Sequence, residues 1–255
     1  MGFPTARPRA AAILLALALI VSKTAAAQDS LGLEALRDAV YDSAPLAEIE
    51  AEAQKAQSLS PQGTAQHLRQ SAIDYFLARG YKENGDTKRA IPCFESAIAA
   101  ADRYLAQAEN PQVPGLLAKA KALSELAILK DLVFLAAKGP QVPALAKKIL
   151  ELDPSNLGAL LITASAKAYP PRVFGGDPQE AIRLVDKALA SRPGGIPGGI
   201  PGGLAKDELF DLRACMATAY EKAGDKAGAL AWFSAALELY PHNRYALERL
   251  GTLKK

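Results

Sequence analysis

The chain has 255 residues, of which 30 are Lys or Arg and 27 are Asp or Glu, so its formal net charge is only +3. Arg7, Arg9 and Lys23 account for that excess, and the chain after residue 27 is neutral. A neutral chain without a basic block lacks the charge that nucleic-acid binding requires, so the composition excludes nucleic acid as a partner. It also gives no attraction to an anionic membrane surface.

Alanine is abundant in this sequence, whereas Val, Ile and Thr are sparse, and no run alternates apolar and polar residues. Alanine is the best helix former, and β-branched residues favour strands. We therefore expect an all-α protein, and the 228 residues after position 27 suffice for one sizeable domain or one elongated solenoid.

Residues 1–27 have the parts of a secretory signal peptide: basic residues at 7 and 9, an apolar run of twelve at 10–21, and alanines at 25–27. Twelve apolar residues fall short of the ~20 that cross a bilayer. No cysteine near the cleavage site offers a lipid anchor. We expect an exported protein, periplasmic or secreted, that begins at about Gln28 and does not insert into a membrane. A buried N-terminal helix is the alternative.

The rest of the chain divides into predicted helices and loops. Helices are expected at 31–41 and 45–57, within an N-terminal capping unit of residues 28–63, and then at 65–83 and 87–108. A long helix is expected at 116–137, apolar nearly all round and therefore buried between neighbours. Shorter helices are expected at 142–152, 155–168 and 178–191.

One spacing of small and aromatic residues occurs twice in full. Residues 209–241 read LFDLRACMATAYEKAGDKAGALAWFSAALELYP, and residues 72–98 repeat their pattern around a second Gly-Asp pair. The matching positions are Ala217, Tyr220, Gly224, Asp225, Ala229, Phe233 and Ala236 in the later copy, and Ala78, Tyr81, Gly85, Asp86, Ala90, Phe94 and Ala97 in the earlier one. Partial copies lie at Ala181, Val185 and Ala188, and around Phe134, Val142, Ile149 and Pro154.

This spacing resembles that of the tetratricopeptide repeat (TPR) family, whose repeats are about 34 residues long. The resemblance covers residues 65–253 loosely and two windows well. The sequence departs from the family where Asp74 and Arg213 replace a large aromatic, and where Asp102 replaces a proline. The resemblance implies an all-α, TPR-like helical-hairpin solenoid of about four irregular repeats, at residues 64–192 and 204–255, with N-terminal capping helices and one C-terminal capping helix.

In the TPR family the first helix of each repeat lines a concave groove that takes a peptide or a partner's helix. Carried over by position, the resemblance implies a partner-binding groove lined by Tyr75, Arg79, Lys82, Leu161, Ser165, Asp211, Thr218 and Glu221. Such a groove has a basic end, an apolar middle and an acidic end. The Lys and Asn set with which TPR proteins hold a C-terminal carboxylate is not present, which disfavours a receptor for C-terminal peptides.

Two loops stand out in the repeat region. At residues 169–178, Asp177 is expected to cap the next helix, with Pro178 at its first position and Glu180 completing a capping box. Tyr169, Arg172 and Phe174 of this loop are candidates for the ligand-binding edge, or else the loop is only structural. Residues 193–203, PGGIPGGIPGG, are expected to be a flexible linker. In the competing interpretation, apolar residues of this segment dock on the solenoid or on a partner.

The sequence carries no recognisable catalytic motif, so we expect no enzyme, no catalytic residue and no cofactor. His67 and His242 lie far apart without Cys or His neighbours, so no metal site is expected. Cys93 and Cys215 could pair in an exported protein, but they fall in different repeats and are expected to be separate thiols.

Two functions remain open from the sequence. The favoured one is an exported scaffold or adaptor that presents a TPR groove to a peptide or a partner protein. The alternative is a ligand-binding accessory of a periplasmic solute transporter, similar to the T-component of tripartite transporters, with transporter subunits as partners. An open pocket lined by Leu123, Leu126 and Phe134 would favour the accessory, and a filled core there would favour the scaffold. The sequence does not indicate the oligomeric state.

Overall fold

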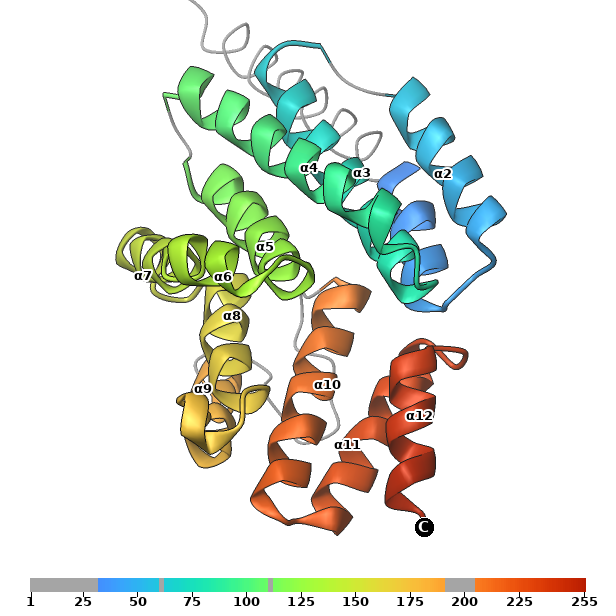
Figure 1. Cartoon of the computed structure of the whole chain (residues 1–255), viewed down its shortest axis with the longest axis vertical. Coiled ribbons are helices and arrows are strands. Elements are labelled where there is room, and N and C mark those ends of the chain that lie inside the picture. Colours follow the sequence, from blue (N-terminus) through green and yellow to red (C-terminus); the bar gives the residue numbers. More distant parts are fainter. Residues whose placement is uncertain (1–31, 60–61, 110–111, 191–204) are drawn as a thin grey trace, which may run out of the picture.

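The computed structural model describes residues 32–59, 62–109, 112–190 and 205–255, and these contain helices and no strand (Figure 1). The predicted all-α fold is therefore confirmed. The proposed signal segment at 1–27 and the Gly/Pro-rich segment at 193–203 lie outside the described residues, so their predictions stay open.

The helices follow one another as hairpins. The N-terminal helix (residues 32–41) precedes α2 (Leu46–Ser58), and the remaining elements are α3 (Thr64–Glu83), α4 (Thr87–Gln107), α5 (Val113–Leu129), α6 (Leu132–Lys138), α7 (Gln141–Leu152), α8 (Leu157–Ala168), the 3-10 turn Arg172–Phe174, α9 (Pro178–Ala190), α10 (Lys206–Ala223), α11 (Lys226–Leu239) and α12 (Arg244–Leu253).

Four successive hairpins stack on one another: α3 with α4, α5 with α7, α8 with α9, and α10 with α11. The first helices also pack in sequence, α3 on α5, α5 on α8 and α8 on α10. This is the arrangement of a TPR-like solenoid with about four irregular repeats, as predicted. The second repeat is irregular because the short helix α6 lies between its two helices.

The Gly-Asp pairs turn two of these hairpins. Gly85 and Gly224 adopt left-handed backbone angles, with φ of 78° and 86°, which glycine tolerates without steric cost. The following residues, Asp86 and Asp225, begin the second helices, because their side chains accept hydrogen bonds from the backbone of Arg89 and Gly228.

The hairpin seams contain the residues that the repeat spacing places there. Phe94 and Phe233 are 0% exposed, and the alanines beside them let the paired helices approach closely. Where the family has an aromatic residue, Asp74 and Arg213 are buried and join the two helices through hydrogen bonds. Ser96 Oγ donates to Asp74 Oδ2 at 2.7 Å, and Arg213 donates to the carbonyl of Ala235.

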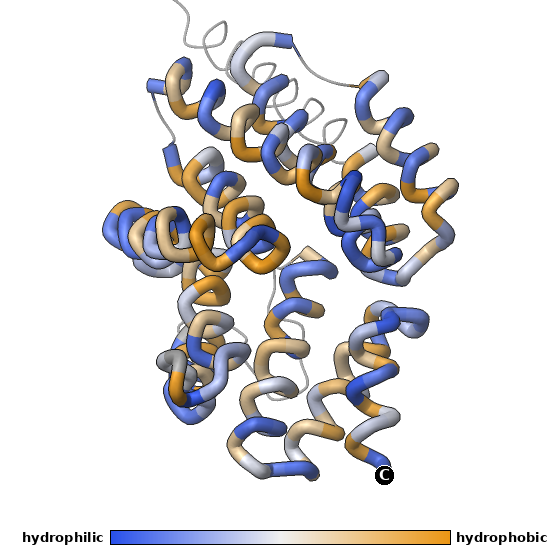
Figure 2. Tube along the Cα trace, viewed as in Figure 1, coloured by the Kyte–Doolittle hydropathy of each residue, from blue (hydrophilic) through white to orange (hydrophobic). Residues whose placement is uncertain are grey.

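The predicted long helix at 116–137 is wrong. Helix α5 ends at Leu129, and Asp131 begins α6 by accepting a hydrogen bond from Phe134 N at 2.8 Å. An aspartate competes for backbone donors and so favours a cap over a helix interior. This break carries Leu132 and Val133 away from the core, where they are 81% and 77% exposed. Figure 2 shows the apolar residues of α6 at the front of the molecule.

The two ends of the described chain meet. As predicted, the capping unit covers the first repeat, with Ile49 of α2 packed in one core cluster with Ile73 of α3. The N-terminal helix also packs on the last repeat, where the ring of Tyr41 lies 5.4 Å from that of Phe210 and 5.2 Å from that of Tyr240. The helices therefore close into a ring rather than an open stack (Figure 1).

Ring closure is made by hydrogen bonds as well as by apolar packing. Asn243 Nδ2 donates to the carbonyl of Tyr41 at 2.6 Å, and the hydroxyl of Tyr240 donates to Asp38 at 2.7 Å across 202 residues of sequence. We call this contact between the N-terminal helix and α10–α12 the ring closure.

Candidate functional site

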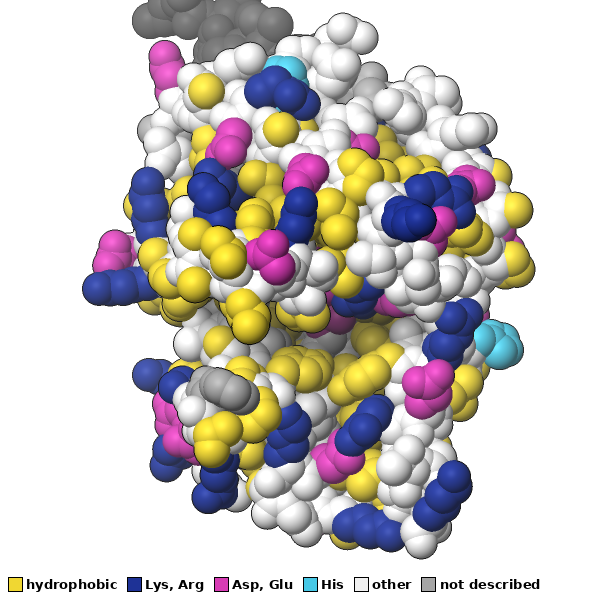
Figure 3. Space-filling model, in the orientation of Figure 1, with side chains coloured by type: hydrophobic (Ala, Val, Ile, Leu, Met, Phe, Trp, Pro, Cys, Tyr) yellow, Lys and Arg dark blue, Asp and Glu magenta, His cyan; other side chains and the backbone are white. Residues whose placement is uncertain are grey.

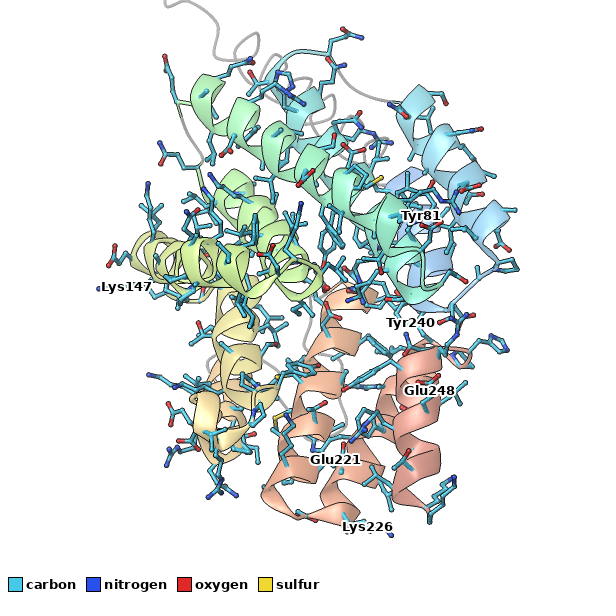
Figure 4. The ribbon with its side chains drawn as sticks, viewed as in Figure 1. Tyr81, Lys147, Glu221, Lys226, Tyr240 and Glu248 are labelled. Atoms are coloured by element: carbon cyan, nitrogen blue, oxygen red, sulfur yellow. The ribbon has the colours of Figure 1, made fainter. Side chains whose placement is uncertain are left out.

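The candidate site is the inner face of the ring, formed by one side of α3, α10 and α12 and by the loop at Tyr169. Figure 3 shows the molecule hollowed between its upper and lower halves, with charged side chains at the floor of the hollow. Figure 4 shows side chains from both halves pointing into this region, whereas Lys147 on α7 points away from it.

Arg79 of α3 lies at the centre of the inner face. Its Nη1 donates to the hydroxyl of Tyr41 at 2.6 Å, and its Nη2 donates to Glu83 at 3.1 Å. The hydroxyl of Tyr41 in turn donates to Asp211 Oδ2 at 2.7 Å, and Arg79 Nη1 lies 3.9 Å from Asp211 Oδ1. Arg79 and Asp211 were expected at opposite ends of a groove, so that prediction is wrong. Ring closure brings them together.

Of these groups Asp211 is the one that solvent reaches most, whereas Tyr41 is 1% exposed. The side chain of Asp211 is 36% exposed, yet burial raises its pKa above the usual value even though Arg79 and the hydrogen bond from Tyr41 act to lower it. Burial likewise raises the pKa values of Tyr41 and Tyr75. Asp211 is therefore a partly exposed carboxylate that is closely surrounded by protein.

The other charged residues predicted for the groove also have internal partners. Lys82 Nζ lies 2.5 Å from Glu125 Oε2. Burial acts to raise the pKa of Glu125, but the charges of Lys82 and Arg79 hold it below its usual value. Glu221 accepts from Arg249 Nε of α12 at 3.1 Å. The inner face therefore compensates its own charge.

Hydroxyl groups gather beside these ion pairs. Thr218 Oγ1 lies 2.8 Å from the hydroxyl of Tyr245, and the hydroxyl of Tyr169 lies near both. Tyr169 and Tyr245 are 42% and 39% exposed, so they are available to a ligand. We call Tyr169, Thr218 and Tyr245 the hydroxyl cluster. The sequence reasoning missed Tyr245, because α12 was treated only as a cap and matches no repeat position.

The middle of the predicted groove is largely closed. Leu161 is half-buried against the core between α8 and α10, and Ser165 Oγ donates to Cys215 Sγ at 3.9 Å. These two residues therefore hold α8 to α10 more than they offer a surface. Tyr75 is also half-buried, with its ring 6.0 Å from that of Phe94.

The loop at 169–178 has a structural explanation for most of its residues. A Cβ on Gly176 would lie 2.0 Å from the carbonyl oxygen of Pro170, so only glycine fits there. Asp177 caps α9 by accepting from Glu180 N at 3.0 Å, as predicted.

The predicted capping box and part of the predicted binding edge are not supported by the loop geometry. The side chain of Glu180 pairs with Arg183, and Asp177 N donates to the carbonyl of Lys167, so the box is not formed. Of the loop candidates, Tyr169 joins the inner face through its hydroxyl. Arg172 is exposed, and the side chain of Phe174 lies outside the described part of the chain.

The region of Leu123, Leu126 and Phe134, where an open pocket would have favoured a transporter accessory, is filled. Leu123 and Leu126 are 3% and 2% exposed, and Phe134 is half-buried against the cluster that contains Leu126. Within the described residues, no group of His, Cys, Asp and Glu could hold a metal ion, and both cysteines are free thiols. No described helix is long and apolar enough to cross a membrane.

Comparisons with known proteins give little beyond this geometry. No family model matches the chain, and no curated protein matches it. A solved structure that is similar is a thermophilic TPR protein of Thermus thermophilus, with 18% sequence identity, coverage of 82% of this chain and 90% of that chain, and a TM-score of 0.47. The description of the fold therefore rests on the hairpins of this chain.

Proposed function

We propose that this protein is an exported scaffold that binds an extended segment of a partner protein on its inner face. The observation that carries the proposal is the convergence of α3, α10, α12 and the loop at Tyr169 on one recessed surface that solvent reaches. Residues from three separate repeats and from the end of the chain contribute to it, which suits a ligand that runs across several elements.

The chemistry of the inner face indicates the kind of segment that fits. Its charges are already paired, as between Lys82 and Glu125, so a highly charged ligand would have to break internal ion pairs. The hydroxyl cluster offers donors and acceptors next to tyrosine rings, a combination that suits peptide groups and uncharged side chains. We therefore propose a partner segment of low net charge, and no nucleic acid.

The export part of the proposal rests on residues 1–27. N-terminal sequencing of the protein from producing cells should find a soluble chain that begins at about Gln28. A membrane-bound form that keeps Met1 would contradict export. We propose no catalytic role, because the sequence carries no recognisable catalytic motif.

The transporter accessory is not favoured. An open apolar pocket at Leu123 and Leu126 would have supported that alternative, but both side chains are buried in the core. A receptor for a hydrophobic solute would have to open this core, which costs the contacts that hold α5 in place.

Site-specific photo-crosslinking tests the proposed binding surface. A photoreactive residue at Tyr245, on the inner face, should crosslink a partner in producing cells. The same residue at Lys147, whose side chain is 80% exposed on α7, is the matched control and should not crosslink that partner. Equal crosslinking from both positions would contradict an inner-face site.

A second measurement links the hydroxyl cluster to the crosslinked partner. Tyr169→Phe and Tyr245→Phe each remove one hydroxyl from an exposed side chain while keeping its ring. Loss of the paired hydrogen bonds to a ligand is worth about 0.5–1.5 kcal/mol each. The two changes together should therefore weaken binding by at least about fivefold, as measured by calorimetry with the crosslinked segment. An unchanged affinity would show that the cluster does not contact the partner.

A further inference from the structure

Helix α6 carries an apolar surface that nothing in the described chain covers. Four large apolar residues at the end of α5 and on α6 are exposed to solvent: Ile128 (75%), Leu132 (81%), Val133 (77%) and Leu135 (44%). Figure 3 shows hydrophobic side chains gathered in this region. We call these four residues the α6 patch.

The local structure of α6 keeps this patch outward. Asp131 caps the helix, and Phe134 is the residue of α6 that packs inward, with Lys130 Nζ 5.8 Å from its ring centroid. Lys130 also pairs with Glu95 at 2.8 Å. The segment is thus a formed and anchored helix, and its apolar side chains face solvent. Contiguous exposed apolar side chains of this kind commonly mark an interaction site.

The charges at the two ends of α6 are complementary to those of a second copy. Asp131 stands at the N-terminus of the helix and Lys138 at its C-terminus, and neither has an ion-pair partner among the described residues. A helix of 7 residues spans about 10 Å. When two α6 helices lie antiparallel, Asp131 of each faces Lys138 of the other, and the helix dipoles oppose each other favourably.

The surface is suited to self-association in two further ways. Ala136 and Ala137 are small and exposed, so two α6 backbones can approach closely. The net charge of the chain is only +3, so two copies repel each other weakly. A two-fold contact needs one patch that complements itself, with an apolar centre and a polar rim, and the α6 patch with Asp131 and Lys138 meets this requirement.

We propose that the protein forms a two-fold symmetric dimer through the α6 patch, with the two α6 helices antiparallel and Asp131 of one copy paired with Lys138 of the other. One short helix and the last turn of α5 make a small interface, so the dimer belongs to the weak class with a dissociation constant of about micromolar order. The patch shares no residue with the inner face, so the dimer and the proposed partner site are independent.

Analytical ultracentrifugation after expression of the full-length chain tests the dimer. The mean mass should rise from one chain to two between about 1 and 100 µM protein. Val133→Asp places an unpaired charge in the centre of the contact and should raise the dissociation constant by at least about tenfold. Leu247→Asp is the matched control, since Leu247 is an exposed apolar residue (45%) on α12, and it should leave the dimer unchanged. Thermal melts at low concentration check that both variants remain folded.

The antiparallel geometry has its own test. Lys138→Glu sets two carboxylates against each other at both ends of the contact and should weaken the dimer by about five- to tenfold at low salt. Adding Asp131→Asn, which keeps a side chain able to cap α6, removes the repulsion and should recover most of that loss. A single-chain mass at every concentration overturns the proposal. A dissociation constant that Val133→Asp leaves unchanged also overturns it. The proposal fails as well if adding Asp131→Asn to Lys138→Glu does not restore the dimer.

Discussion

The two thiols of this chain differ in their surroundings. Cys215 is 1% exposed on α10, and burial raises its pKa to about 12, with a partial offset from Ser165. Cys93 on α4 is half-buried, and burial raises its pKa as well. A cysteine reacts as its thiolate, and only where a reagent can reach the sulfur. Cys93 is the more exposed of the two cysteines, so it is the one that a reagent reaches more easily.

We therefore expect an aromatic disulfide reagent to modify native Cys93 well before Cys215. The Cys215→Ser variant should keep the faster reaction, and the Cys93→Ser variant should lose it, as followed by release of the coloured thiol. Equal rates for the two variants would show that α8 and α10 do not enclose Cys215 as the structure has it.

Asp74 gives a second prediction at this scale. Burial raises its pKa above the usual value, although hydrogen bonds from Ser96 and Gln70 act to lower it. The folded state then binds the proton more tightly than the unfolded chain does. Its contribution to stability is present below the unfolded pKa, and it is lost as the pH rises through the folded pKa.

Asp74→Asn should remove this pH-dependent loss. A carboxyl whose pKa is raised titrates between about pH 3.5 and neutral. Over that range, the free energy of unfolding should fall less with rising pH in the variant than in the wild type. Denaturant melts across that range measure it. The exposed Asp186→Asn is the control. A wild-type pH dependence in Asp74→Asn would mean that this carboxyl is not buried as described.

At the scale of elements, the hairpin seams carry the stability of the repeats. Phe233 and Ala229 are both 0% exposed where α10 meets α11. Phe233→Ala removes a large ring and leaves a cavity, so it should cost about 3–5 kcal/mol of unfolding free energy. Ala229→Leu overpacks the same crossing and should cost about 1–3 kcal/mol.

Denaturant melts of these two variants decide whether the seam is packed as described. The exposed Leu247→Ala should stay within about 0.5 kcal/mol of the wild type, because it touches no core. Near-wild-type stability of both seam variants would mean that the register of the last repeat is wrong.

The second repeat shows how an element prediction fails. Apolar residues run from Leu123 past Leu129 at spacings that suit one buried helix. Periodicity describes a face but does not say where a helix stops. Asp131 stops it, and the residues after the break lose their neighbours. The apolar residues that suggested one long buried helix are therefore the ones that form the exposed α6 patch.

For the whole molecule, ring closure is the feature that sets this chain apart from an open stack. In an open stack each repeat contacts only its neighbours, so the ends fray independently. Here Tyr41 packs on Phe210 and Tyr240, so loss of one contact at the N-terminal helix should loosen the C-terminal helices too.

Hydrogen exchange tests this coupling. Tyr41→Ala should raise the exchange of backbone amides in α11 and α12 by about tenfold or more, although these helices lie about 200 residues away in sequence. The control is Ile149→Ala, another fully buried position, on α7, which should not act selectively on α12. If Tyr41→Ala affects only α2 and α3, the ring is open in solution.

The amino-acid sequence determined the local structure of this protein by itself. The all-α class, the turns at Gly85 and Gly224, the caps at Asp86 and Asp225 and the buried seam at Phe233 are set by contacts within about one repeat, and residue spacing records such contacts directly. Only the tertiary structure decided the layout of the candidate site. The pairing of Arg79 with Asp211, the place of Tyr245 and the closure through Tyr41 depend on small rotations between repeats that add up over the whole chain, and no local spacing encodes their sum.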